Sequence, residues 1–146
     1  MAFVNDDEGA ARRVAAGADA GCTFKHCGFA CVREPELSQE AGFHPLEVVQ
    51  AATLNGAELP GLADVIGSVV PGKRADVVLV GEKPVTNFKM LYGTARMRLD
   101  QERGEVVPVG GVRWTIRDGI VYDAPKLLAD VRAMLAETKR AEGAAP

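Results

Sequence analysis

The chain has 146 residues, of which 47% are hydrophobic and 25% are charged, the size and balance of one globular domain. Its 17 basic and 20 acidic residues give a net charge of -3. This charge argues against a nucleic-acid partner, because such proteins carry a basic surplus. No run of about 18 uncharged apolar residues is present to span a membrane, and residues 1–8 lack the regions of a signal peptide. We therefore expect a cytoplasmic protein with no nucleic-acid or membrane partner.

The first predicted elements are a short helix after Asn5 and a buried strand over residues 13–17. Asn5 precedes three acidic residues, which stabilise the first turn of a helix. Gly17 and Gly21 then flank Asp19 at the end of the strand. A carboxylate in this place can hold a divalent metal or take a proton from a metal-bound water. Alternatively, Asp19 caps the backbone of the next segment.

Two helices are expected next, over residues 34–41 and from Pro45 to about residue 55. Proline suits the first position of a helix. Glu47 is placed to reach back to the residue before the helix, as in a capping box. The pair Asn55-Gly56 is expected to end this helix.

The second half of the chain reads as strands followed by a helix. Strands are expected over 66–70 and 75–80 around a turn at 71–73. Further strands are expected over 106–109, 112–116 and 120–122, with a tight turn at 118–119. Asp123 precedes a helix over 124–139 that is expected to lay an apolar face on the strands, formed by Leu127, Leu128, Val131 and Leu135.

Residues 67–73 match the first seven positions of a phosphate-binding loop, but the context does not fit nucleotide binding. The eighth position is Arg74, where that motif has the Ser or Thr that binds magnesium. A strand pattern follows the motif in place of the helix whose N-terminus would hold phosphate. We interpret the segment as a structural turn.

Two further groups of residues have side chains that could carry chemistry. Four potential zinc ligands fall within ten positions: Cys22, His26, Cys27 and Cys31. Their residue types suit zinc, but their spacing does not, because tetrahedral sites pair two close ligands with two distant ones. Their alternative role is packing, because free cysteine behaves as a small apolar residue. His44 could act as a catalytic base, but its place before Pro45 favours helix capping or surface exposure. Ser38 and Ser68 lack the nearby His and Asp partners of a nucleophile.

Four ordered blocks resemble the C-terminal third of metal-dependent amidohydrolases, in particular the imidazolonepropionase-like and prolidase-like branch. The blocks are residues 15–21, 45–57, 66–79 and 117–124. The resemblance implies an α/β fold: the last strand and helices of a (β/α)8 barrel, then the C-terminal share of a small β-sandwich and a terminal helix. It also implies that Asp19 is the acid after the last barrel strand, a metal ligand and a proton shuttle.

On this resemblance the chain is expected to divide into four parts. Residues 1–64 correspond to the end of the barrel and residues 65–123 to the sandwich portion. A C-terminal helix follows over 124–140, and 141–146 form a tail.

The chain also departs from the family pattern in its metal ligands. The family carries His-x-His on its first barrel strand, a bridging Lys and two later His ligands; this sequence has two histidines, His26 and His44, and neither falls on a ligand position. One carboxylate cannot hold a catalytic zinc, which takes about three protein ligands. We therefore expect a C-terminal part of such an enzyme that has no bound metal by itself and is inactive without the rest of the barrel.

The complete enzyme is expected to bind a divalent metal, zinc by resemblance, and to hydrolyse the C–N bond of a small amide or peptide substrate. Dipeptides, N-acyl amino acids and cyclic amides remain open as substrates. The alternatives are a non-catalytic truncated homologue or self-associating β-module, and a small metalloprotein that uses the cysteine cluster. Unpaired strand edges and an apolar face would favour a homo-oligomer.

Overall fold

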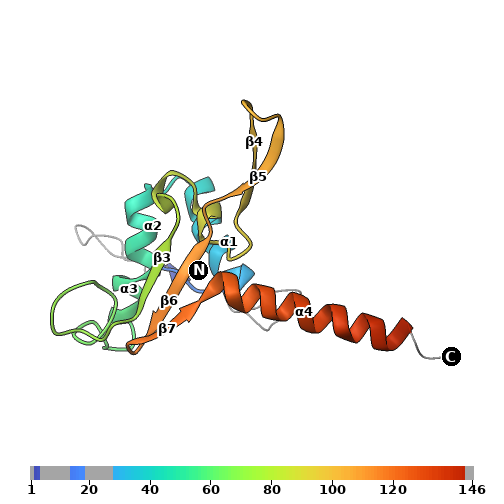
Figure 1. Ribbon diagram of the computed structural model, residues 1–146. Helices are drawn as coiled ribbons and strands as arrows, with labels where there is room; N and C mark the ends of the chain where they lie inside the picture. The colour runs from blue at the N-terminus through green and yellow to red at the C-terminus, as the bar shows by residue number, and fades with distance from the viewer. Residues whose placement is uncertain (1, 4–13, 19–27, 144–146) are drawn as a thin grey trace.

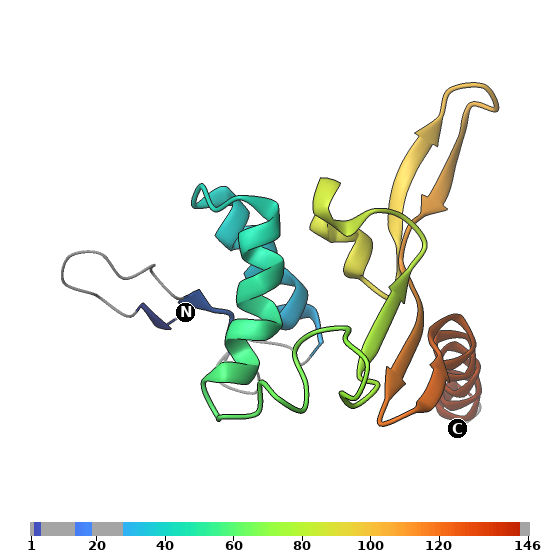
Figure 2. The ribbon, with the colours of Figure 1, turned by 90° about the vertical axis from the view of Figure 1, so that its left-hand side faces the viewer.

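The computed structural model describes residues 2–3, 14–18 and 28–143. Three helices lie to one side of a three-stranded antiparallel sheet: α1 (Phe29–Glu40), α2 (Pro45–Ala52) and α3 (Leu54–Glu58). A fourth helix, α4 (Ala124–Gly143), leaves the sheet on its other side (Figure 1 and Figure 2). The secondary structure is therefore mixed α and β, as expected.

The predicted strand at residues 13–17 is present as a short element, β2 (Val14–Ala15). It pairs antiparallel with β1 (Ala2–Phe3). Both residues of β2 are buried. The strand is held against the helices, because the Ala16 N–H donates to the carbonyl of Ala51 at 3.0 Å.

Helix α1 begins at Phe29, five residues before the predicted start at residue 34. The prediction placed Pro35 in the first turn, where proline is best tolerated. In the structure Pro35 lies inside the helix, where its ring nitrogen has no hydrogen to donate to the carbonyl four residues earlier.

Helix α2 begins at Pro45, as predicted, but the single helix expected to residue 55 is two helices. α2 ends at Ala52, the backbone departs from helical geometry at Thr53, and α3 follows. Gly56 lies within α3, so the prediction that Asn55-Gly56 ends the helix is wrong.

The strand predicted over residues 66–70 is absent, and the backbone there is bent and irregular. Its polar groups are bonded locally: the Ile66 N–H donates to the Leu62 carbonyl at 3.0 Å, and the Arg74 N–H donates to the Val65 carbonyl at 2.9 Å. The apolar run Val69-Val70 is exposed. A run of apolar residues alone therefore does not make a strand when no partner strand lies beside it.

The sheet consists of β3 (Val77–Val80), β6 (Val112–Arg117) and β7 (Ile120–Asp123), in the order β3-β6-β7. These three strands were predicted within one or two residues. Both pairs are antiparallel, and Asp118 and Gly119 have φ values of 50 and 79, the left-handed conformation that a two-residue hairpin turn requires.

Sequence reasoning missed the segment between β3 and β5. It forms two 3-10 turns, η1 (Pro84–Thr86) and η2 (Phe88–Leu91), and then β4 (Arg96–Asp100), which pairs with β5 (Glu105–Val109). Figure 1 shows the β4–β5 hairpin projecting from the body. The strand β4 was missed because three of its five residues are charged.

The buried apolar residues among those described lie where the helices meet the 3-10 turns and β2: Val14, Ala15, Val48, Ala51, Ala57, Phe88 and Met90. Helix α4 was expected to cover the sheet with its apolar face, yet it runs away from the body beyond its first turns (Figure 1). Leu127, Val131 and Leu135 are more than half exposed. No helix in residues 28–143 is long and apolar enough to cross a bilayer.

Candidate functional site

Asp19, the predicted metal ligand, lies outside the described residues, but the strand that leads to it is described. The Asn55 side chain donates from Nδ2 to the Val14 carbonyl at 2.8 Å. Together with the bond from Ala16 to Ala51, this contact fixes the carboxyl end of β2 against α2 and α3. The backbone continues through Gly17, which is exposed, and Ala18, which is half-buried.

Of the proposed cysteine cluster, the structure describes Cys31 alone. Its thiol is free and exposed on α1. Cys22, His26 and Cys27 lie outside the described residues, so the zinc hypothesis stays a prediction. Within the described ranges, no three His, Cys, Asp or Glu side chains come together in a way that could hold a metal.

His44 caps α2, as predicted. Its Nδ1 accepts from the Leu46 N–H at 3.3 Å, and the Glu47 carboxylate accepts from the His44 N–H at 2.8 Å. The imidazole Nδ1 is thus engaged with the backbone at the first turn. This geometry supports the expected structural role of His44.

Lys73, the lysine of the phosphate-loop-like segment, binds its own loop. Its ammonium donates to the Ser68 hydroxyl at 2.7 Å, to the Ile66 carbonyl at 3.4 Å and to the Ala63 carbonyl. The strand β3 follows the loop, as predicted, in place of a helix. The Lys73 side chain therefore holds its own loop together by donating hydrogen bonds to the loop's carbonyls.

Gly67, the first glycine of the same motif, is required by packing. Its φ is 89, and a Cβ built there would lie 2.6 Å from the Cβ of Ala57 in α3. Any other residue would be strained in this conformation and would collide with the helix. The glycine of the motif thus allows the loop to approach α3 closely.

The two serines considered as nucleophiles are both engaged in hydrogen bonds. The Ser38 hydroxyl donates to the Glu34 carbonyl at 2.9 Å within α1, and the Ser68 hydroxyl accepts from Lys73. Neither contact involves the imidazole that would activate a serine.

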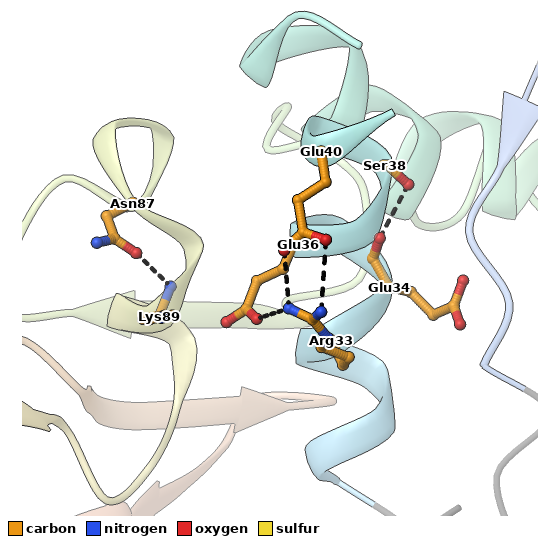
Figure 3. A network of polar contacts seen from close by, with 7 residues as sticks. All are labelled: Arg33, Glu34, Glu36, Ser38, Glu40, Asn87 and Lys89. Carbon is orange, nitrogen blue, oxygen red and sulfur yellow. Dashed lines mark hydrogen bonds and ion pairs between the residues drawn. The ribbon is translucent and has the colours of Figure 1, made fainter. Parts of the chain in front are cut away.

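A polar cluster on α1 was not found by sequence reasoning (Figure 3). Arg33 contacts Glu36 at 2.6 Å and Glu40 at 3.1 Å, and the Glu36 side chain is 9% exposed. Tyr92 lies beside this cluster, and its burial and the nearby Glu36 carboxylate raise its pKa. The Tyr92 ring also packs on the Phe29 ring, with 5.7 Å between the ring centroids. The available signal was the spacing of Arg33, Glu36 and Glu40, but it requires a helix that begins before residue 33. The cluster ties α1 to the segment after η2 and contains no nucleophile paired with a base.

Asp76 holds the start of β3 to the turn between β6 and β7. Its Oδ1 accepts from the Asp118 N–H at 2.8 Å, and its Oδ2 contacts Arg74 Nε at 2.9 Å. The backbone N–H and then the Arg74 guanidinium lower the pKa of Asp76, because both favour the ionised carboxylate.

The comparisons with known proteins give the family. Residues 7–109, more than half of the chain, match the model of the amidohydrolase family. The chain belongs to the amidohydrolase family. This match includes the strand β2, the position of Asp19, the helices α1–α3 and the hairpin β4–β5.

Individual relatives within the amidohydrolases are similar over part of the chain. Imidazolonepropionase of Geobacillus kaustophilus (strain HTA426) is 33% identical over 81 residues, which are 56% of this chain and 17% of that protein. Adenine deaminase 3 of Rhizobium meliloti (strain 1021) is 35% identical over 66 residues, 45% of this chain and 11% of that protein.

The fold of one solved structure is also similar. A Xaa-Pro dipeptidase with methionine bound in its active site superposes with a TM-score of 0.54 and 28% identity, over 75% of this chain and 22% of that chain. The present chain therefore spans about a fifth or less of the length of these relatives. Its α/β architecture agrees with that of a hydrolase of the family.

Proposed function

We propose that this chain is the C-terminal portion of a metal-dependent amidohydrolase that hydrolyses amide-type C–N bonds in a small substrate. The match to the amidohydrolase family over residues 7–109 carries the proposal. Two of the similar proteins, an adenine deaminase and a Xaa-Pro dipeptidase, are named for removing an amino group or splitting a dipeptide. Both reactions break a C–N bond with water, which supports this class of chemistry.

The anchored end of β2 supports a role for Asp19. Asn55 and Ala51 bind the backbone of residues 14–16, so the strand leads toward residue 19 from a fixed position. In a barrel enzyme, catalytic groups follow the carboxyl ends of strands. We assign to Asp19 the role of one metal ligand and proton shuttle, as the family resemblance implies.

The described residues do not fit a metal site. They bring no three candidate ligands together, and Nδ1 of His44 is used in helix capping. A catalytic zinc takes about three protein ligands. We therefore assign the other ligands to the part of the enzyme that corresponds to the rest of the barrel, and we derive no step through the metal in this chain.

The sheet supports the assignment of residues 65–123 to an incomplete β-sandwich. In a sheet, directly opposite residues on neighbouring strands, and residues two apart on one strand, have side chains on the same face. One face of this sheet carries five apolar side chains: Val77, Leu79, Trp114, Ile116 and Val121. The opposite face carries Val78, Ile120 and Tyr122, all of them exposed. A sheet with apolar residues on both faces is a layer that other elements cover.

A chimera tests this proposal. The segment of the Geobacillus kaustophilus imidazolonepropionase that corresponds to residues 7–109 is replaced by those residues. We expect the folded chimera to retain hydrolysis, and Asp19→Asn to lower kcat by at least about 100-fold. The matched control is Asp64→Asn, which changes an exposed acid in the loop after α3 and should leave kcat unchanged. A folded, active chimera whose kcat is unaffected by Asp19→Asn would overturn the assignment.

A further inference from the structure

Helix α4 presents an unpartnered apolar surface, which we call the α4 stripe: Leu127, Val131, Met134 and Leu135. These side chains are between 51% and 65% exposed. Their spacing of three and four residues places them on one side of the helix. Beyond its first turns the helix runs away from the body, as Figure 1 shows.

Beyond the first turn of α4, where Lys126 lies on the same side as Asp130, the charges beside the α4 stripe are sorted by sign. At 100° per residue, Asp130 and Glu137 lie along one flank of the stripe, and Arg132 and Lys139 lie along the other. All four are exposed, and none is ion-paired within the part of the chain that the structure describes. One flank is therefore acidic and the opposite flank is basic.

The charges on two copies of α4 complement each other in one relative orientation of the helices. A two-fold axis parallel to the helix brings the acidic flank of one copy against the basic flank of the other. A two-fold axis perpendicular to the helix, which makes the pair antiparallel, brings acid against acid and base against base. The flanking charges therefore favour a parallel, in-register pair.

The chain as a whole exposes more surface than a compact chain of its mass. The chain exposes 10935 Å², whereas a compact chain of its mass exposes roughly 7,200 Å². Apolar patches of this kind mark interaction surfaces.

We propose that the α4 stripe is the contact through which two copies of this chain associate, with the two α4 helices parallel and in register. Val131 and Leu135 form the centre of the contact. Asp130 and Glu137 of each copy face Arg132 and Lys139 of the other. This pairing does not depend on the proposed hydrolytic function.

Sedimentation velocity of the full chain tests the contact. We expect a dimer at tens of micromolar protein, and the double substitution Val131→Glu with Leu135→Glu should raise the dimer Kd at least about tenfold. The control Ala133→Glu, on the opposite side of α4, should leave the Kd unchanged. Circular dichroism checks that α4 is retained in each variant. A monomer at every concentration, or a dimer indifferent to the double substitution, overturns the proposal.

Disulfide crosslinking tests the orientation. Thr138→Cys is introduced where Cys22, Cys27 and Cys31 are replaced by serine. A parallel pair places the two introduced thiols side by side, so oxidation should link most of the chains, whereas Ala133→Cys should link few. Low crosslinking of the Thr138→Cys variant, in a protein that still dimerises, overturns the parallel arrangement.

Discussion

At the scale of single residues, two polar side chains donate hydrogen bonds to backbone carbonyls in place of a backbone N–H. Lys73 gathers carbonyls of the loop over residues 63–68, where the predicted strand does not form. Asn55 binds the Val14 carbonyl at the point where β2 meets α3. A buried carbonyl left without a donor is costly, so Lys73 holds the loop in place and Asn55 holds the strand β2.

Lys73→Met keeps the length of the side chain and removes its three hydrogen bonds. We expect the free energy of unfolding to fall by about 1–3 kcal/mol, because the loop carbonyls lose a charged donor. Chemical denaturation measures the change. Lys83→Met, at an exposed position before η1, is the control and should have little effect. Equal stability of the two variants would contradict the role of Lys73.

Asn55→Ala removes the donor to the Val14 carbonyl. A loss of about 1–2 kcal/mol of stability is expected, with faster amide exchange at Ala16, whose N–H bonds to Ala51 beside it. Gln50→Ala changes an exposed residue of α2 and serves as the comparison. Unchanged protection of Ala16 in the Asn55 variant would show that β2 is held by other contacts.

Asp76 gives a pH dependence with a defined sign. Folding lowers the pKa of Asp76, so its contribution to stability is complete above the unfolded-state pKa and is lost as pH falls through the folded-state pKa. Asp76→Asn should therefore lower Tm at neutral pH, and its difference from the parent should shrink steadily below about pH 4. Thermal melts from pH 7 to pH 3 measure this, with Asp64→Asn as control. A difference that grows on acidification would contradict the assignment.

At the scale of elements, the 3-10 turn η2 anchors the small core. Phe88 and Met90 are each 2% exposed, as is Val48 of α2, and the tilted Phe29–Tyr92 ring contact joins α1 to the segment just after η2. The segment over residues 84–91 carries no strong periodicity, yet its two buried side chains connect the helices to the strands. A short irregular element thus contributes more to the core than the long helix α4.

Phe88→Ala is expected to lower stability by about 3–5 kcal/mol, because a large buried ring is lost and a cavity remains. Phe29→Ala is the comparison, since the Phe29 ring is more than half exposed, and we expect its effect to be less than about half as large. Denaturant unfolding of both variants measures the two losses. A similar cost for both would mean that the core is centred elsewhere.

Elements with local signals could be predicted from the sequence. The capping of α2 depends on His44, Pro45 and Glu47, which are adjacent, and the β6–β7 hairpin depends on Asp118-Gly119. The absence of a strand at 66–70, by contrast, depends on Lys73 and on a tight approach of Gly67 to α3. These are contacts between segments, and no local pattern reports them.

The candidate site was predicted less completely than the fold. Membership in the amidohydrolase family follows from ordered blocks of sequence, and the comparison confirms it. The role of Asp19 stays a prediction, because it depends on ligands that two histidines cannot supply. The Arg33–Glu36–Glu40 cluster was missed, since the start of α1 was placed after Arg33.

At the scale of the whole molecule, the fold is an open set of layers. The sheet has apolar residues on both faces, the hairpin β4–β5 projects from it, and α4 leaves it with its apolar side uncovered (Figure 1). Such surfaces are covered in stable proteins by further elements or by another copy. We propose that the rest of a larger enzyme covers the sheet and that a second copy of the chain covers the α4 stripe.

Zinc content and hydrolysis of the purified full chain test the central claim most directly. With zinc or manganese added, we predict less than stoichiometric bound metal and no hydrolysis of dipeptides or N-acyl amino acids. Neither readout should change in Asp19→Asn or in the joint serine substitution of Cys22, Cys27 and Cys31. One tightly bound zinc per chain, with chelator-sensitive turnover that Asp19→Asn abolishes, would contradict the account and show that this chain has a complete site of its own.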